Sequence, residues 1–267
     1  MLRRAPTAVD ARVDHTNLTP LMLAAAGSKK NTDIIRHLKD NGAQVNAQDN
    51  KGRTPVMHAA SAGRLFNLKF LLDEPSVDIS IRDGEEKTTA LMYAAESGSA
   101  SGVELLLAVP DIDPMLKDQN GWTALTFAAW MGSLDMVELL LEDPRVIMAL
   151  EHGPSDAMIS SSIPDGRGET QRLTNTDFAL KVACEREHLG VIHRLLKDGR
   201  FDPNLCDDDG YTLLHYAVVY ERVEVAEVFL EYGARTDISN HSGKTALDLA
   251  KGSERMIKIL EEPREKN

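Results

Sequence analysis

The side chains of this 267-residue chain that most often perform catalysis or bind metals are its eight histidines and two cysteines. The histidines are His15, His37, His58, His152, His188, His193, His215 and His241. None lies in an HExxH zinc motif, and the chain has no Gly-x-Ser-x-Gly nucleophile turn or Walker glycine loop. Cys184 and Cys206 have no metal-ligand spacing, and a thiol nucleophile needs a neighbouring base. The sequence therefore predicts no catalytic residue, metal site or cofactor.

Three consecutive carboxylates in the string DDDG (207–210) are a candidate for acid chemistry or cation binding. A calcium site needs about six to eight oxygen ligands. The apolar residues around this string supply no second set of ligands at a suitable spacing. Because aspartate and glycine are typical of tight turns, we interpret 207–210 as a turn that carries extra negative charge.

The overall charge argues against one class of partner. Lys and Arg total 30 and Asp and Glu total 42, a net charge of −12, whereas nucleic-acid binding requires clustered positive charge. Acidic residues collect late in the chain, at Asp207, Asp208, Asp209, Glu221, Glu224, Glu227 and Glu231. This run is either a solvated face or a surface that attracts a basic segment of a partner protein, an attraction that salt would weaken.

The ends and the apolar runs of the chain predict its location. The first residues, MLRRAPTAVDARVD, contain two arginines but no apolar stretch behind them, unlike a secretory signal. No run approaches about 18 apolar residues, so we expect no membrane span. Two cysteines fit a reducing compartment. We therefore expect an intracellular monomer, located in the cytoplasm, the nucleus or both.

The order of the residues is more informative than their types, because a seven-residue string recurs. Its copies are TPLMLAA (19–25), TPVMHAA (54–60), TALMYAA (89–95), TALTFAA (123–129), FALKVAC (178–184), TLLHYAV (212–218) and TALDLAK (245–251). Successive copies start 35, 35, 34, 55, 34 and 33 residues apart. Such a period is typical of repeat architectures, and the single step of 55 indicates an insertion of about 21 residues.

Each string is followed by a second apolar segment with helical spacing, as in Val137, Leu140 and Leu141. Several of these segments end in glycine, as at Gly199, where a left-handed residue is needed. Another glycine, such as Gly210, precedes the next string in a short turn. The repeating unit is therefore a turn, a helix, a tight turn and a second helix.

This pattern resembles the ankyrin repeat, whose motif joins an Asp- and Gly-containing turn to Thr-Pro-Leu-His-x-Ala-Ala, a Leu-rich helix and Gly-Ala-x-Val-Asn. The motif is clearest in GAQVNAQDNKGRTPVMHAASAG (42–63) and NLCDDDGYTLLHYA (204–217). The resemblance covers residues 16–262. It implies an all-α ankyrin-repeat solenoid of about seven helix-turn-helix units, with short hairpin loops and one long inserted loop.

Units are expected to start near residues 16, 50, 84, 119, 174, 208 and 241, after an N-terminal extension (1–15) and before a polar tail (263–267). Two departures from the motif bear on local structure. Asn17 stands where a turn glycine is usual, and Phe178 replaces the threonine that normally caps the first helix. Loss of this cap predicts a weaker fifth unit. Paired alanines such as Ala59 and Ala60 should let neighbouring units approach closely.

Ankyrin repeats bind partners through their hairpin tips and the concave surface of their first helices. The matching residues here are Arg53, Trp122, Trp130, Met131, Tyr211, Tyr220 and Lys244. Stacking of the units does not require aromatics at these positions, and aromatics are enriched in binding hot spots. We expect these residues to bind another protein, with Arg53 and Lys244 as peripheral polar contacts. The alternative is that Trp122 or Trp130 packs against the insertion.

The resemblance also implies roles for residues outside this surface. Ankyrin units are often hydroxylated on the hairpin asparagine, and Asn46 and Asn204 match that position. His215 occupies the histidine of the motif, whose ring usually makes a structural hydrogen bond. His58 lies one position later and is expected in a largely buried column.

The insertion (147–172) leads to a second hypothesis about function. Its Gly, Ser, Pro and Asp residues are typical of a loop, but it also contains Met158 and Ile159. We expect it to lean over the concave groove beside Trp122 and Trp130. The leading prediction is a non-catalytic scaffold for protein–protein interaction. The alternative is an enzyme or small-molecule receptor with a pocket of about 300 Å³ or more between the insertion and these aromatics.

Overall fold

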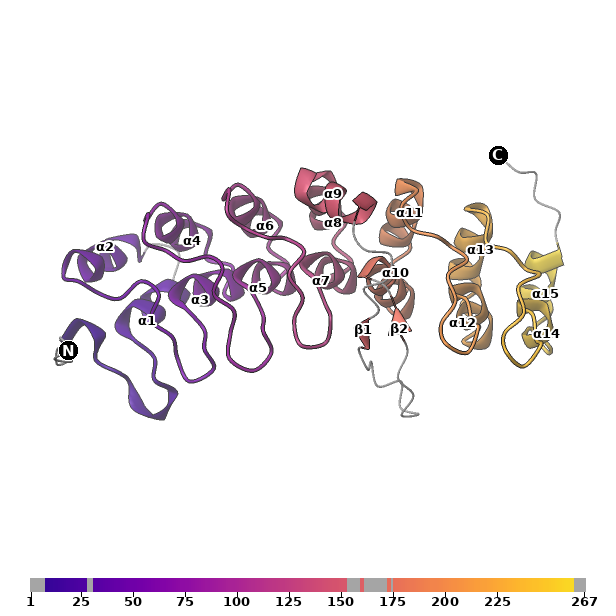
Figure 1. Ribbon diagram of the computed structural model, residues 1–267, viewed down its shortest axis with the longest axis horizontal. Helices are drawn as coiled ribbons and strands as arrows, with labels where there is room; N and C mark the ends of the chain where they lie inside the picture. The colour runs from indigo at the N-terminus through magenta and orange to yellow at the C-terminus, as the bar shows by residue number, and fades with distance from the viewer. Residues whose placement is uncertain (1–7, 28–30, 153–158, 161–171, 174, 262–267) are drawn as a thin grey trace.

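The computed structural model of the protein describes residues 8–27, 31–152, 159–160, 172–173 and 175–261. Over these residues the chain forms an elongated solenoid of helices in an inner and an outer row, and hairpin loops project from the inner row (Figure 1). Each helix packs mainly against its partner in the other row and its neighbours in its own row. The predicted helical-repeat solenoid is therefore confirmed.

The inner row contains α1 (Pro20–Ala26), α3 (Pro55–Ser61), α5 (Ala90–Glu96), α7 (Ala124–Met131), α10 (Asn175–Glu185), α12 (Leu213–Val219) and α14 (Ala246–Leu249). The outer row contains α2 (Thr32–Asp40), α4 (Leu65–Leu72), α6 (Ala100–Leu107), α8 (Leu134–Glu142), α11 (Leu189–Asp198), α13 (Val223–Glu231) and α15 (Glu254–Glu261). Two short 3₁₀ helices, η1 (Ala8–Asp10) and η2 (Asp14–Thr16), precede α1. None of the helices in the described ranges is long and apolar enough to cross a membrane.

Most inner helices begin at a threonine, because its hydroxyl caps the helix. The Thr54 hydroxyl accepts a hydrogen bond from the Met57 amide (3.4 Å), which satisfies one of the free amides of the first turn. The same cap is made by Thr19, Thr89, Thr123, Thr212 and Thr245. Phe178, at the threonine position of the fifth unit, lies inside α10 and is 1% exposed. The fifth unit thus lacks the threonine cap, and its lower stability stays a prediction.

Hairpin loops of neighbouring units are bonded to each other near their tips. The Gly84 amide donates to the Lys51 carbonyl (2.7 Å), and the Gln119 amide donates to the Glu86 carbonyl (2.7 Å). Gly52 is required at this contact, because its φ is +78° and a Cβ atom would lie 2.4 Å from the Gly84 nitrogen. The hairpins therefore form a continuous edge over these units.

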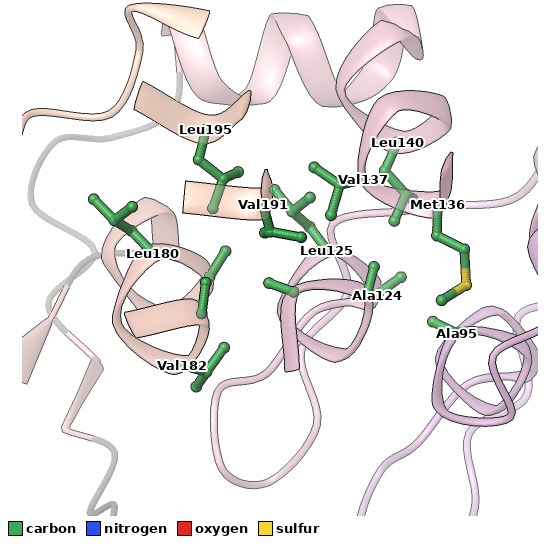
Figure 2. Close-up of a cluster of buried hydrophobic side chains, with 14 of the residues drawn as sticks. Ala95, Ala124, Leu125, Met136, Val137, Leu140, Leu180, Val182, Val191 and Leu195 are labelled. Atoms are coloured by element: carbon green, nitrogen blue, oxygen red, sulfur yellow. The ribbon is translucent and has the colours of Figure 1, made fainter. Parts of the chain in front are cut away.

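Small residues let the inner helices approach one another. The paired alanines of α3, α5 and α7 are at most 1% exposed, namely Ala59, Ala60, Ala94, Ala95, Ala128 and Ala129. Above them, Met136, Val137 and Leu140 point from α8 toward the inner row, and Val191 and Leu195 do so from α11 (Figure 2). The core is thus a continuous layer between the two rows.

The prediction of a loop over residues 147–172 was wrong for residues 147–152, which belong to α9 (Pro144–His152). The Asp143 side chain accepts a hydrogen bond from the Arg145 amide (2.9 Å), and proline suits the first position of a helix. Further along, β1 (Ile159–Ser160) pairs antiparallel with β2 (Arg172–Leu173). The remainder of the insertion, 153–158 and 161–171, lies outside the described residues.

Replacement of Ala95 by lysine is expected to lower the free energy of unfolding by about 3 kcal/mol or more, because the site has neither room for the side chain nor a partner for its charge. Urea denaturation followed by helical circular dichroism measures the change. Ala108→Lys is the matched control, because Ala108 is exposed at the C-terminal end of α6. Equal effects of the two substitutions would contradict close packing of the inner row.

Candidate functional site

Each hairpin tip is held by a carboxylate or amide at the start of its turn. Oδ1 of Asp118 accepts hydrogen bonds from the backbone amides of Asn120 and Trp122, both at 2.8 Å. The equivalent tip amides are bonded in the same way, Arg53 by Asp49, Tyr211 by Asp207 and Lys244 by Asn240. These bonds fix the backbone of the tip residues at regular intervals along the solenoid.

The DDDG string is one of these turns, as its sequence indicates. Oδ1 of Asp207 accepts from the amides of Asp209 (3.0 Å) and Tyr211 (2.8 Å), while Asp208 and Asp209 are exposed. Within the described part of the chain, no three His, Cys, Asp or Glu side chains are gathered as a metal site requires.

A ring from the first helix completes the turn in several units. Tyr93 donates to Oδ2 of Asp83 (2.8 Å), and Tyr216 donates to Oδ2 of Asp207 (2.5 Å). The ring of His58 makes the corresponding bond to Asp49 (3.0 Å). This column therefore anchors the hairpins, which explains its partial burial.

The fourth unit departs from this arrangement, because Phe127 has no donor for its turn carboxylate. Phe127 instead meets Trp122 edge to face, with ring centroids 5.1 Å apart. Burial raises the pKa of Asp118, and the hydrogen bonds from the Trp122 and Asn120 amides oppose this shift. An aromatic contact has thus replaced a hydrogen bond at this hairpin.

Trp122, Phe127 and Trp130, with Arg186 of the fifth unit, form what we call the tryptophan cluster. The rings of Trp122 and Trp130 are 5.4 Å apart, and the Arg186 guanidinium lies 3.6 Å from the centre of the Trp130 ring. Both tryptophans are half-buried. They pack against each other and against the fifth unit, so they contribute to the fold as well as to the surface.

Three tyrosines of the sixth unit, Tyr211, Tyr216 and Tyr220, form a second aromatic group, the tyrosine row. Tyr211 and Tyr216 have ring centroids 5.5 Å apart, and Tyr216 and Tyr220 are stacked at 6.3 Å. Tyr220 is 49% exposed, and the Arg222 guanidinium lies 5.4 Å from its ring centre. This row is therefore the more exposed of the two aromatic groups.

A pocket lies between the two aromatic groups, where α10 faces α12. These two helices approach each other much less closely than other neighbouring inner helices, although the outer helices α11 and α13 keep the usual spacing (Figure 1). The pocket is lined by Lys181, Cys184, Glu185, Leu213, Tyr216, Ala217, Tyr220, Arg222 and Val225. The cavity volume is about 50 Å³. This is well below the volume of about 300 Å³ expected for a small-molecule site.

The polar side chains that line this pocket interact with one another or with the backbone. Burial raises the pKa of Glu185, and the positive charges of Lys181 and Arg222 oppose this shift. Nη1 of Arg222 donates to the Cys184 carbonyl (2.7 Å). Burial also raises the pKa of the Cys184 thiol, which makes it a poor nucleophile.

The structure distinguishes among the predicted partner-binding residues. Met131 and Tyr220 are 44% and 49% exposed, and Lys244 is also exposed. The guanidinium of Arg53 is instead bonded to Asp49 (2.9 Å), so it is engaged within its own hairpin. The structure brings Trp122 and Trp130 together in one group. Tyr211 and Tyr220 lie in a second group, with Tyr216 between them. Arg53 and Lys244 belong to neither group, because they are in other hairpins.

Both candidate hydroxylation residues connect neighbouring hairpins. Nδ2 of Asn46 donates to the Ser76 carbonyl (2.7 Å), and its Oδ1 accepts from the Asp78 amide (2.9 Å). Oδ1 of Asn204 accepts from the Arg235 amide (2.7 Å). These asparagines have a structural function, and their hydroxylation stays a prediction.

Sequence reasoning missed Lys181, Arg222 and the pocket itself, and it placed Arg186 on the concave side without predicting its contact with Trp130. A signal was present in the repeat. At the two inner-helix positions where other units mostly have alanine, Cys184 and Leu213 occur, and both line the pocket. Larger residues at these two positions thus coincide with the wider spacing of α10 and α12.

Together, the stacked helix pairs and the hairpins between them define a helical-repeat protein with partly exposed aromatics on its inner row. The family model for ankyrin repeats (three copies) matches residues 5–83, 75–149, 158–241 and 180–267. The chain therefore belongs to the ankyrin repeat family, whose repeats generally mediate protein–protein interaction.

Sequence relatives share only part of their length with the chain. Rabankyrin-5 of Mus musculus is 40% identical over 70 residues, which are 26% of this chain and 6% of that protein. Putative palmitoyltransferase ZDHHC13 of Danio rerio is 34% identical over 71 residues, 27% of this chain and 11% of that protein. The chain thus spans a small fraction of these relatives.

Solved ankyrin repeat domains have the same fold. The ankyrin repeat domain of Bcl-3 matches with a TM-score of 0.70 at 22% identity, over 92% of this chain and 99% of that domain. The ankyrin repeat domain of human ASB11 matches with a TM-score of 0.67 at 23% identity, over 93% and 100% of the two chains. At these identities the likeness shows the shared architecture.

Phe127→Tyr is expected to raise the free energy of unfolding by about 1 kcal/mol, because the new hydroxyl can donate to Oδ2 of Asp118 as in the neighbouring units. Urea denaturation measures the change, and Tyr93→Phe is the reciprocal control, with an expected loss of similar size. A destabilising effect of Phe127→Tyr would show that contact with Trp122 leaves no room for the hydroxyl.

Stability is expected to decrease as the pH falls below about 6.5, because His215 is fully buried and both ring nitrogens are hydrogen-bonded. Burial lowers its pKa in the folded state, so the unfolded chain takes up the proton first. The contribution of His215 to the free energy of unfolding is therefore fully present above about pH 6.5 and is lost as the pH falls below that value. Urea midpoints at pH 7.5 and 5.5 should differ less for His215→Gln than for the natural chain, and equal differences would contradict this assignment.

Proposed function

We propose that the chain is a non-catalytic scaffold that binds another protein through the hairpin tips and inner helices of its fourth to sixth units. The observation that carries this proposal is the exposure of Met131, next to the half-buried Trp130, and of Tyr220 in the tyrosine row. Exposed aromatic and methionine side chains around a packed centre are typical of binding hot spots. The repeats themselves are held together by other positions, chiefly the buried alanines.

The burial and hydrogen bonding of Cys184, His215 and Asp207 support a non-catalytic role. Cys184 is buried as a thiol, and both ring nitrogens of His215 are hydrogen-bonded within the fold. Both carboxylate oxygens of Asp207 accept hydrogen bonds from its own unit. These three side chains are thus buried or engaged within the fold, whereas Cys206 is an exposed thiol.

A basic segment is the partner chemistry that the surface charge favours. Asp208 and Asp209 are exposed beside Tyr211, and Glu221 is exposed beside Tyr220. The nearby Arg222 is already bonded to Glu187 (3.4 Å) and to the Cys184 carbonyl. Lys or Arg side chains of a partner would therefore meet unengaged carboxylates around the tyrosine row. We place this interaction inside the cell, between the partner and a monomeric scaffold.

Tyr220→Ala is expected to weaken partner binding by about 2 kcal/mol, roughly thirtyfold in Kd, with little change in stability. Trp130→Ala should weaken binding similarly but also destabilise the fold, because Trp130 packs against Trp122 and Arg186. The partner is first identified by affinity capture with the natural chain, and Kd is then measured by calorimetry.

Phe66→Ala is the matched control, because Phe66 is 68% exposed and lies on α4 in the outer row, far along the chain from the aromatics. Its loss should leave Kd unchanged. Equal losses for Phe66→Ala and Tyr220→Ala, or no loss for Tyr220→Ala, would refute the proposed surface.

A further inference from the structure

The gap between α10 and α12, which we call the α10–α12 seam, lies between the two aromatic groups. Tyr216 and Tyr220 of the tyrosine row form part of its wall, and Glu185 adjoins Arg186 of the tryptophan cluster. A peptide that crossed from one aromatic group to the other would therefore pass over this opening. The seam belongs to the same surface as the proposed function, and the following inference depends on that function.

The size of the seam pocket suits one side chain. One ordered water needs about 10–15 Å³ of such space. The pocket offers about 50 Å³, several times this space, so it can take a group of a few heavy atoms. The side chains of leucine, isoleucine and methionine have four heavy atoms each, whereas a drug-sized ligand needs several times more space.

The pocket wall is predominantly apolar. Leu213, Ala217 and Val225 come from α12 and α13, while the tyrosine rings and the buried Cys184 cover other parts. Lysine side chains can line such pockets with their methylene groups, as Lys181 can here. An apolar group is therefore favoured in the pocket, because most of the exposed wall is apolar and a polar group would lose its water there.

The rim of the pocket has the opposite character. Glu185 lies at the rim and is exposed, and Asp208, Asp209 and Glu221 are exposed beside the tyrosine row. Positive charge is also present at the pocket, because Lys181 and Arg222 line it and Arg186 lies over Trp130, and all three oppose the raised pKa of Glu185. The acidic character of the rim therefore comes chiefly from Asp208, Asp209 and Glu221. The exposed carboxylates would therefore attract a Lys or Arg side chain of the partner that lies next to the apolar group in the pocket.

We propose that the α10–α12 seam is a socket for one leucine-, isoleucine- or methionine-sized side chain of the partner protein, in a segment that carries Lys or Arg within about three residues of it. The socket exists because Cys184 and Leu213 stand where other units mostly have alanine, which keeps the two inner helices apart. Burial of one such side chain stabilises a complex enough to decide which sequences bind.

The test uses the full chain and a phage-displayed library of random 12-residue peptides. Enriched peptides are expected to share one Leu, Ile or Met with a neighbouring Lys or Arg. Replacement of that apolar residue by alanine should raise Kd about tenfold or more. A selection without binders, or with binders that lack the shared apolar residue, would overturn the inference.

Two variants of the protein test the socket itself. The double variant C184A/L213A places alanine at both positions, as in most other units. The inner helices α10 and α12 should then approach each other and close the seam, while the fold is retained. Cys184→Phe should fill the pocket without closing it. Both are expected to weaken binding of the selected peptides about tenfold or more, with circular dichroism and thermal unfolding as checks of the fold. If Cys184→Phe does not fold, the double variant alone decides.

The outcomes separate this inference from the proposed function. If Tyr220→Ala weakens binding but C184A/L213A does not, the surface binds its partner without the socket, and the inference is wrong. If neither variant changes Kd, both proposals fail. If C184A/L213A abolishes the preference for the apolar residue and Asp208→Lys weakens binding of the basic peptides, the socket and its acidic rim are both supported.

Discussion

The close approach of neighbouring inner helices across small side chains is the constraint on which the solenoid depends. A unit of two short helices cannot bury its apolar face alone, so it must share a core with its neighbours. Ala59, Ala94 and Ala128 are fully buried and leave the backbones near each other. Because the inner helices lie this close together, the outer helices can cover one continuous apolar layer. Successive hairpins also come near enough for their tips to form hydrogen bonds with each other.

The turn carboxylates connect this packing to the binding surface. One oxygen of Asp207 holds the amide of Tyr211, and the other accepts a hydrogen bond from Tyr216 of the following helix. The same residue therefore positions a tip side chain and an inner-helix ring, both of which belong to the proposed binding surface. In the fourth unit, Phe127 removes the second bond and a tryptophan cluster occupies the site. Surface and fold are thus built from the same contacts, and half-buried aromatics contribute to both.

Much of the fold could be predicted because its determinants recur in register. Threonine caps, paired alanines and turn glycines mark most units, and Asn17, in place of a turn glycine, adopts a positive φ of 62° as its position requires. The site was less predictable, because the engagement of Arg53 by Asp49 and the stacking of Arg186 on Trp130 depend on rotamers and on neighbouring units. Helix α9 was missed because polar residues after it suggested a loop, although Asp143 and Pro144 mark its start.

The wide spacing at Cys184 and Leu213 also bears on how the array unfolds. The stability of a repeat protein is approximately a sum of unit terms and nearest-neighbour interface terms. Where α10 and α12 face each other, the inner part of that interface is reduced, and α11 with α13 carries most of the connection. The last two units are therefore among the parts of the described array that are less coupled to the rest. Their amide hydrogens should exchange together, and anything that fills the gap would join the two blocks into one cooperative unit.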